Sequence, residues 1–77
     1  MIDVLFFAEL QEKVGSEKVS MEADGLSVAD LKQKLTQEYS SLKLDHAMIA
    51  VNEEYAQEAT VLNNGDTVAF IPPVSGG

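Results

Sequence analysis

The sequence predicts an α+β domain in which one main helix packs on one face of a small mixed sheet. Three observations support this class. Short β-branched and aromatic runs lie near both ends of the chain, an amphipathic stretch with a capping signal lies between them, and turn residues separate the segments. A chain of 77 residues without repeats or a linker leaves room for one small domain. Periodicity does not choose among the topologies of this class.

Residues 2–7 predict the first strand, because β-branched and aromatic side chains dominate this run. Neighbouring side chains of a strand point to opposite faces of the sheet. One face then carries Ile2, Val4 and Phe6, and the other carries Asp3, Leu5 and Phe7. Both faces are largely apolar, which a sheet covered on one side does not require.

Residues 9–13 can form a short helical turn, and Gly15 suits the left-handed residue that ends it. Residues 17–22 then alternate between polar and apolar side chains, which predicts a second strand with Val19 and Met21 facing inward.

The main helix is predicted from Val28 to residue 38 or 39. Ser27 can cap its first turn, and Asp30 can complete a capping box. Val28, Leu31 and Leu35 repeat at helical spacing and should face the core. The side chains expected on the solvent side are Lys32, Lys34 and Gln37.

Two further strands are expected after the helix, at residues 48–51 and 67–71. Residues 52–54 and 63–66 should form turns, because Asn and Gly tolerate positive φ. Prolines end the last strand, since they cannot donate to a sheet ladder. We therefore expect one domain over residues 1–71 and a flexible C-terminal tail over residues 72–77.

The tail ends in Gly76-Gly77, preceded by Pro72-Pro73. Glycines lack a Cβ, so that such an end can pass through a narrow channel and present its carboxylate bare. The prolines would stiffen the exit and direct the tail away from the body. The alternative is a frayed end without a role.

Composition excludes several classes of function. The net charge is −8, which argues against nucleic acid or anionic membrane and favours a basic protein partner. The absence of cysteine removes disulfides, thiolate metal sites and thiol nucleophiles, and His46 stands alone. The start of the chain lacks a signal-peptide pattern, so a cytoplasmic location is expected. So short a chain has little material for a substrate pocket, which favours a carrier over an enzyme.

Four stretches carry a resemblance to a known family. They are residues 4–8, residues 14–15, residues 50–52 and the closing run NGDTVAFIPPVSGG over residues 64–77. Together they resemble the small, sulfur-carrier subunits of molybdopterin synthases, in the MoaD/ThiS-like family, over essentially the whole chain. Ile71 departs from the family, which often has a second aromatic residue there.

The resemblance implies a ubiquitin-like β-grasp fold and a protein that is not an enzyme on its own. An adenylyltransferase resembling ubiquitin-activating proteins would use ATP to adenylate the Gly77 carboxylate. A sulfurtransferase would convert the adenylate into a thiocarboxylate. Gly77 would then donate sulfur to a pterin precursor held by the large, catalytic subunit, with Gly76 giving access. Two small and two large subunits are implied, and the chain itself would bind no cofactor and no metal.

The uncovered sheet face then becomes a predicted partner interface. Its members are Leu5, Phe7, Tyr55 and Ile71, followed by the tail residues Pro72, Pro73, Val74 and Ser75. Aromatic anchors inside a polar rim are the usual pattern of binding hot spots. The alternative is a thick core with some exposed apolar surface. Likewise, Glu53, Glu54 and Glu58 could face a basic surface of the activating enzyme or simply form a solvated turn.

Three other functions stay open. A sulfur carrier for thiamin thiazole synthesis has the same fold, although residues 70–74 resemble the molybdopterin branch. A protein modifier conjugated to lysines would use the same acyl adenylate. A plain interaction domain with a chance Gly-Gly end would tolerate loss of the tail.

Overall fold

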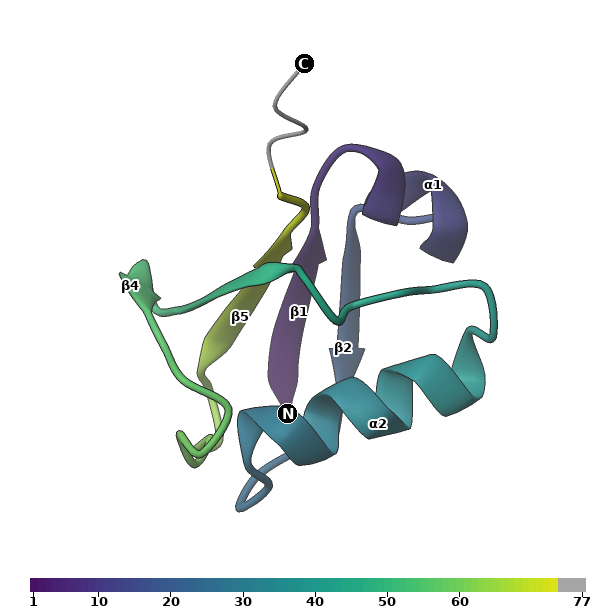
Figure 1. Cartoon of the computed structure of the whole chain (residues 1–77). Helices are drawn as coiled ribbons and strands as arrows, with labels where there is room; N and C mark the ends of the chain where they lie inside the picture. The colour runs from purple at the N-terminus through teal and green to yellow at the C-terminus, as the bar shows by residue number, and fades with distance from the viewer. Residues whose placement is uncertain (74–77) are drawn as a thin grey trace.

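The computed structural model describes residues 1–73 of the chain. Within this range the chain forms five strands and two helices (Figure 1). In chain order they are β1 (Ile2–Phe6), α1 (Glu9–Val14), β2 (Lys18–Met21), α2 (Val28–Glu38), β3 (Met48–Val51), β4 (Glu54–Tyr55) and β5 (Thr67–Ile71).

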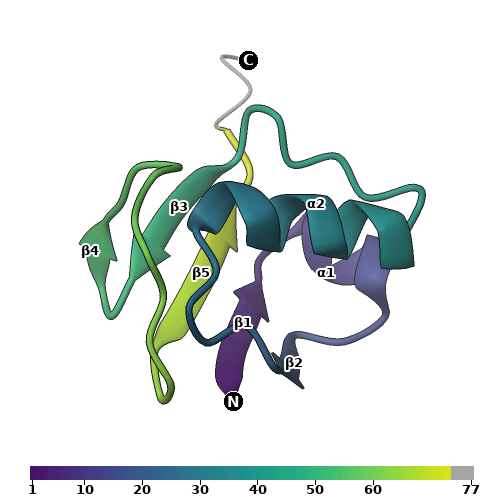
Figure 2. The same cartoon turned by 90° about the horizontal axis from the view of Figure 1, so that it is seen from below.

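The strands form one mixed sheet in the order β2-β1-β5-β3-β4. β1 and β5, from opposite ends of the chain, are parallel neighbours in the centre, with Phe6 beside Phe70. β2 is antiparallel to β1, and β3 is antiparallel to both β5 and β4. α2 lies across one face of this sheet (Figure 2). The sheet therefore has a face that α2 covers and an open face.

The core lies between α2 and the covered face. The Phe6 and Phe70 rings stack there with centroids 6.0 Å apart and an interplanar angle of 16°. Such an aromatic pair adds to the free energy of burial. The helix contributes Val28, Leu31 and Leu35, which are fully buried, as are Ile2, Val4 and Val68 of the strands.

The main helix has the predicted bounds and cap. The Ser27 side chain accepts a hydrogen bond from the Asp30 amide at 3.1 Å, and the Asp30 carboxylate accepts one from the Ser27 amide. This capping box satisfies two amides that lack partners within the helix. The short helix α1 is confirmed as well, and Gly15 ends it in the left-handed conformation.

Three details of the sequence prediction were wrong. β1 ends at Phe6, so Phe7 lies just beyond the strand. Glu54 belongs to β4, a two-residue strand that is too short to carry a period-two pattern. Lys32 is not a solvent-facing side chain, because only 13% of it is exposed and its ammonium pairs with Glu58 at 2.7 Å.

The chain leaves β1 through a turn of unusual geometry. Ala8 has φ 52° and ψ −129°, and the Leu10 amide donates to the Phe7 carbonyl oxygen at 3.1 Å. Positive φ at the first central position of such a turn is normally adopted by glycine. The turn sends the chain from the edge of the open face into α1.

Candidate functional site

The open face of the sheet carries a shallow hollow of about 690 Å³. The four interface residues that were predicted on the sheet face all line this hollow. Leu5 and Ile71 are partly buried, whereas Phe7 is 46% and Tyr55 76% exposed. The full lining consists of Leu5, Phe7, Ala50, Asn52, Glu53, Tyr55, Thr67, Ala69 and Ile71.

The strand register explains why the sheet is hollowed at this place. Leu5 pairs with Ala69, Ala69 pairs with Ala50, and Ala50 pairs with Tyr55, so these four residues form one row across four strands. Paired residues on one face have side chains side by side. Two alanines therefore form a low floor between the larger Leu5 and Tyr55.

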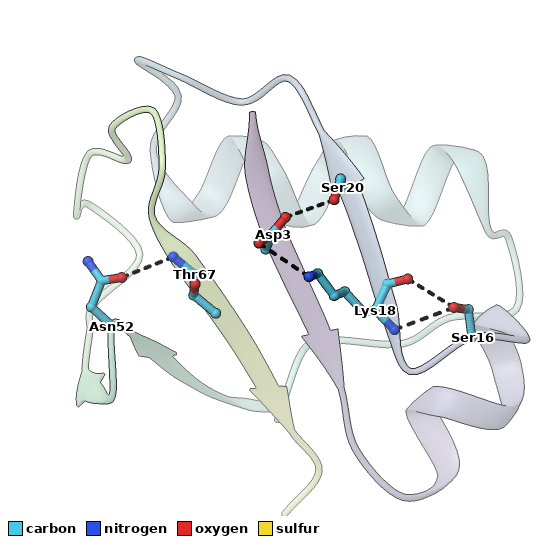
Figure 3. A network of polar contacts seen from close by, with 6 residues as sticks. All are labelled: Asp3, Ser16, Lys18, Ser20, Asn52 and Thr67. Atoms are coloured by element: carbon cyan, nitrogen blue, oxygen red, sulfur yellow. Dashed lines mark hydrogen bonds and ion pairs between the residues drawn. The ribbon is translucent and has the colours of Figure 1, made fainter.

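A cluster of three polar side chains borders the hollow on the β2 side. On the open face, the Ser20 hydroxyl donates to the Asp3 carboxylate at 2.8 Å, and the Lys18 ammonium lies 3.5 Å from it (Figure 3). The Ser20 hydrogen bond and, to a lesser extent, the Lys18 charge hold the pKa of Asp3 below its ordinary value. An apolar patch edged by polar groups has the anatomy of a protein interface.

The turn between β3 and β4 borders the opposite side. Asn52 begins this turn and binds the start of β5 through its backbone and its side chain (Figure 3). Its side-chain amide also donates to the Asp66 carboxylate at 2.9 Å. Hydrogen bonds from the Asn63 amide and from Asn52 lower the pKa of Asp66.

The tail begins at the edge of the hollow. Phe6 pairs with Phe70 in the parallel strands β1 and β5, so the residues that follow them, Phe7 and Ile71, lie at the same end of the sheet. Pro72 comes directly after Ile71. The prolines themselves do not line the hollow. Pro72 and Pro73 border a separate depression with Glu9, Leu10, Lys43, Asp45, His46 and Ala47. The predicted site residues Val74, Ser75, Gly76 and Gly77 lie outside the described residues.

The structure separates the three predicted acidic residues. Glu53 lines the hollow, whereas Glu54 lines a different depression. Glu58 pairs with Lys32, which lowers the pKa of the Glu58 carboxyl. The depressions lined by Glu53 and Glu54 adjoin, because Asn52 and Tyr55 line both, and a basic partner for these carboxylates stays a prediction.

Sequence reasoning missed the alanine floor and the Asn52 contacts. The parity of the two later strands was a usable signal, because Ala69 lies between the buried Val68 and Phe70, and Ala50 lies between the buried Ile49 and the half-buried Val51. Their meeting depended on strand pairing, which periodicity does not give.

Over residues 1–73, no three His, Cys, Asp or Glu side chains are grouped so that they could hold a metal ion. No helix in that range is long and apolar enough to cross a membrane.

Known proteins resemble this chain along its whole length. The sequence model of the ThiS family matches residues 4–77. The molybdopterin synthase sulfur carrier subunit of Escherichia coli is 37% identical over 81 aligned positions, which cover 100% of both chains.

Two solved structures share the fold. One is a complex of subunits 1 and 2 of the molybdopterin-converting factor from Helicobacter pylori, with a matched chain 29% identical, a TM-score of 0.71, and coverage of 99% of this chain and 97% of that one. The other is the small archaeal modifier protein 1 of Haloferax volcanii, 27% identical with a TM-score of 0.76, covering 95% and 97%. The ubiquitin-like β-grasp prediction is thereby confirmed, with α1 as a second helix.

Proposed function

This chain belongs to the ThiS family, and from that membership we propose that it is the sulfur-carrier subunit of a molybdopterin synthase. The observation that carries the proposal is the match to the Escherichia coli sulfur carrier subunit over the full length of both chains. The C-terminal sequence Gly76-Gly77 fits this role, because a carrier must present a bare carboxylate.

The proposed chemistry takes place on the Gly77 carboxylate. A carboxylate is a poor electrophile, so an adenylyltransferase first couples it to the α-phosphorus of ATP with loss of pyrophosphate. The terminal sulfur of a sulfurtransferase persulfide then attacks the acyl carbon, and AMP leaves. A thiol cleaves the resulting S–S bond, which forms a disulfide and releases the thiocarboxylate. All groups that act as acids or bases belong to the partner proteins.

We propose the open face as the surface that docks the large subunit. Phe7 and Tyr55 are exposed anchors over an alanine floor, within a polar rim. The tail follows Ile71, which lines the hollow, and its six residues reach about 20 Å when fully extended. A large subunit seated on the hollow could therefore receive Gly77 in a nearby active site. One dithiolene needs two sulfurs, so two tails that each carry a thiocarboxylate act in succession in an assembly of two small and two large subunits.

Deletion of Gly77 tests the carrier role. The deletion moves the terminal carboxylate by about 3.5 Å, far beyond the roughly 1 Å misplacement that already costs about 10²-fold in rate. The variant should fold and bind the large subunit but form no dithiolene with purified partners. Gly77→Ala keeps the length and adds one methyl group, so its loss of product should be smaller.

The outcomes of this experiment are distinct. Intact-mass analysis should show exchange of one oxygen for sulfur on the terminal residue of the parental protein. Product formation at the parental rate without Gly77 would contradict the carrier role.

The likeness to the small archaeal modifier protein favours a second candidate, a modifier conjugated to lysines. The acyl adenylate serves both fates, because a lysine amine can attack the same acyl carbon as a persulfide. Recovery of the tail in isopeptide linkage to other proteins would support the modifier, and recovery of the thiocarboxylate alone would support the carrier.

A further inference from the structure

The turn between β3 and β4 places a charged residue in a conformation that favours glycine. Val51 pairs with Glu54, so Asn52 and Glu53 are the two residues of a tight hairpin turn. Their φ angles are 51° and 71°. Turns with two positive φ angles usually have the sequence Asn-Gly. Asn52 follows that preference and Glu53 does not.

Contacts of Asn52 hold the turn in place. The Asn52 amide donates to the Thr67 carbonyl oxygen at 2.8 Å, and the Thr67 amide donates to the Asn52 side-chain oxygen at 3.0 Å. The side-chain amide of Asn52 donates to Asp66. The turn is thus attached to β5, and Glu53 is presented at a fixed place on the rim of the hollow.

Glu53 is also distinct electrostatically. Among the residues described, it is the one charged side chain that lines the hollow; the other lining residues are apolar, or neutral as Asn52 and Thr67 are. Glu54, its neighbour, does not line the hollow but an adjoining depression that shares Asn52 and Tyr55 with it. A residue kept in an unfavourable backbone conformation at a surface hollow points to a functional requirement.

We propose that Glu53 determines partner specificity by pairing with a basic side chain of the large subunit docked on the hollow. The inference rests on the proposed function. Docking on an apolar face removes water from the rim, and a carboxylate that loses water without gaining a cation opposes binding. An Arg can satisfy both carboxylate oxygens at once. A partner with a neutral or acidic residue at that position would be rejected.

The test is a pair of matched variants, Glu53→Gln and Glu54→Gln. Both remove one negative charge from adjacent residues, so the effect on long-range attraction is the same. The dissociation constant of each for the purified large subunit should separate them. We expect Glu53→Gln to weaken binding about tenfold or more and Glu54→Gln less than about twofold. Glu53→Lys should weaken it further, by about a hundredfold.

Glu53→Gly separates the backbone from the carboxylate. Glycine accepts positive φ, so the melting temperature should rise, while the affinity for the large subunit should fall as in Glu53→Gln. Equal affinities of the parental protein, Glu53→Gln and Glu54→Gln would overturn the role of Glu53 and leave the proposed function standing. Failure of the parental protein itself to bind the large subunit would overturn both.

Discussion

Asn52 and Thr67 exchange two hydrogen bonds: the Asn52 amide donates to the Thr67 carbonyl oxygen at 2.8 Å, and the Thr67 amide donates to the Asn52 Oδ1 at 3.0 Å. One residue of a hairpin turn thereby mimics a strand partner for the first residue of β5. The contact joins the β3–β4 hairpin to the centre of the sheet. Both residues also line the hollow on the open face.

The first prediction concerns Asn52. Asn52→Ala loses the side-chain hydrogen bonds to Thr67 and Asp66. Alanine, unlike asparagine, has no side-chain hydrogen bond to offset the unfavourable φ of 51°. Asn52→Ala should lower the free energy of unfolding by about 2 kcal/mol. Asn52→Gly should lower it by about 1 kcal/mol, because glycine tolerates this φ angle. Denaturant unfolding measures both. Equal losses for the two variants would show that the φ angle carries no strain.

The second prediction concerns the pH dependence of stability. The pKa of Asp66 in the folded protein lies below its ordinary value of 3.8, because Asn63 and Asn52 donate hydrogen bonds to the carboxylate. A folded pKa below the unfolded one contributes stability that is complete above pH 3.8 and is lost as the pH falls through the folded pKa. The difference in unfolding free energy between the parental protein and Asp66→Asn should therefore shrink between pH 6 and pH 2.

Asp45→Asn serves as the control for the loss of one negative charge, because Asp45 lies outside the Asn52 contacts. Denaturant unfolding at a series of pH values gives the three curves. A gap between parental protein and Asp66→Asn that widens on acidification has the wrong sign and would contradict the assignment.

The third prediction concerns Ala8, whose φ of 52° and ψ of −129° suit glycine. Ala8→Gly should relieve the turn and raise the free energy of unfolding by about 1 kcal/mol, despite the greater entropy of the unfolded chain. Ala29→Gly, inside α2, is the matched control and should lower it by about 1 kcal/mol. A loss of stability in both variants would mean that the Ala8 conformation is not strained.

The fourth prediction concerns Phe7. The ring is 46% exposed and lies on the open face, away from the core between the sheet and α2. Phe7→Ala should weaken binding of the large subunit by about 2 kcal/mol and change stability by less than about 1 kcal/mol. Val61→Ala truncates another exposed apolar residue that does not line the hollow, and should leave binding unchanged. A variant that loses stability but not affinity would place Phe7 in the core.

Local chemistry was sufficient to predict most elements from the sequence. The cap at Ser27 and the spacing of Val28, Leu31 and Leu35 specify α2 without any distant contact. The alternation along β1 separates a core face from a second apolar face, which was enough to predict that Leu5 and Phe7 lie on the open face of the sheet. The Gly76-Gly77 end and the family resemblance come from the residues themselves.

The arrangement of those elements required the tertiary structure. Parallel pairing of β1 with β5 joins residues about sixty positions apart, and no local pattern encodes such a partner. That pairing, with the β3–β5 register, brings Leu5, Ala69 and Ala50 into one row and so creates the hollow. The pairing of Val51 with Glu54 places Glu53 in the hairpin turn, where it lines the hollow, whereas Glu54, one residue later, lies in β4 and lines the adjoining depression.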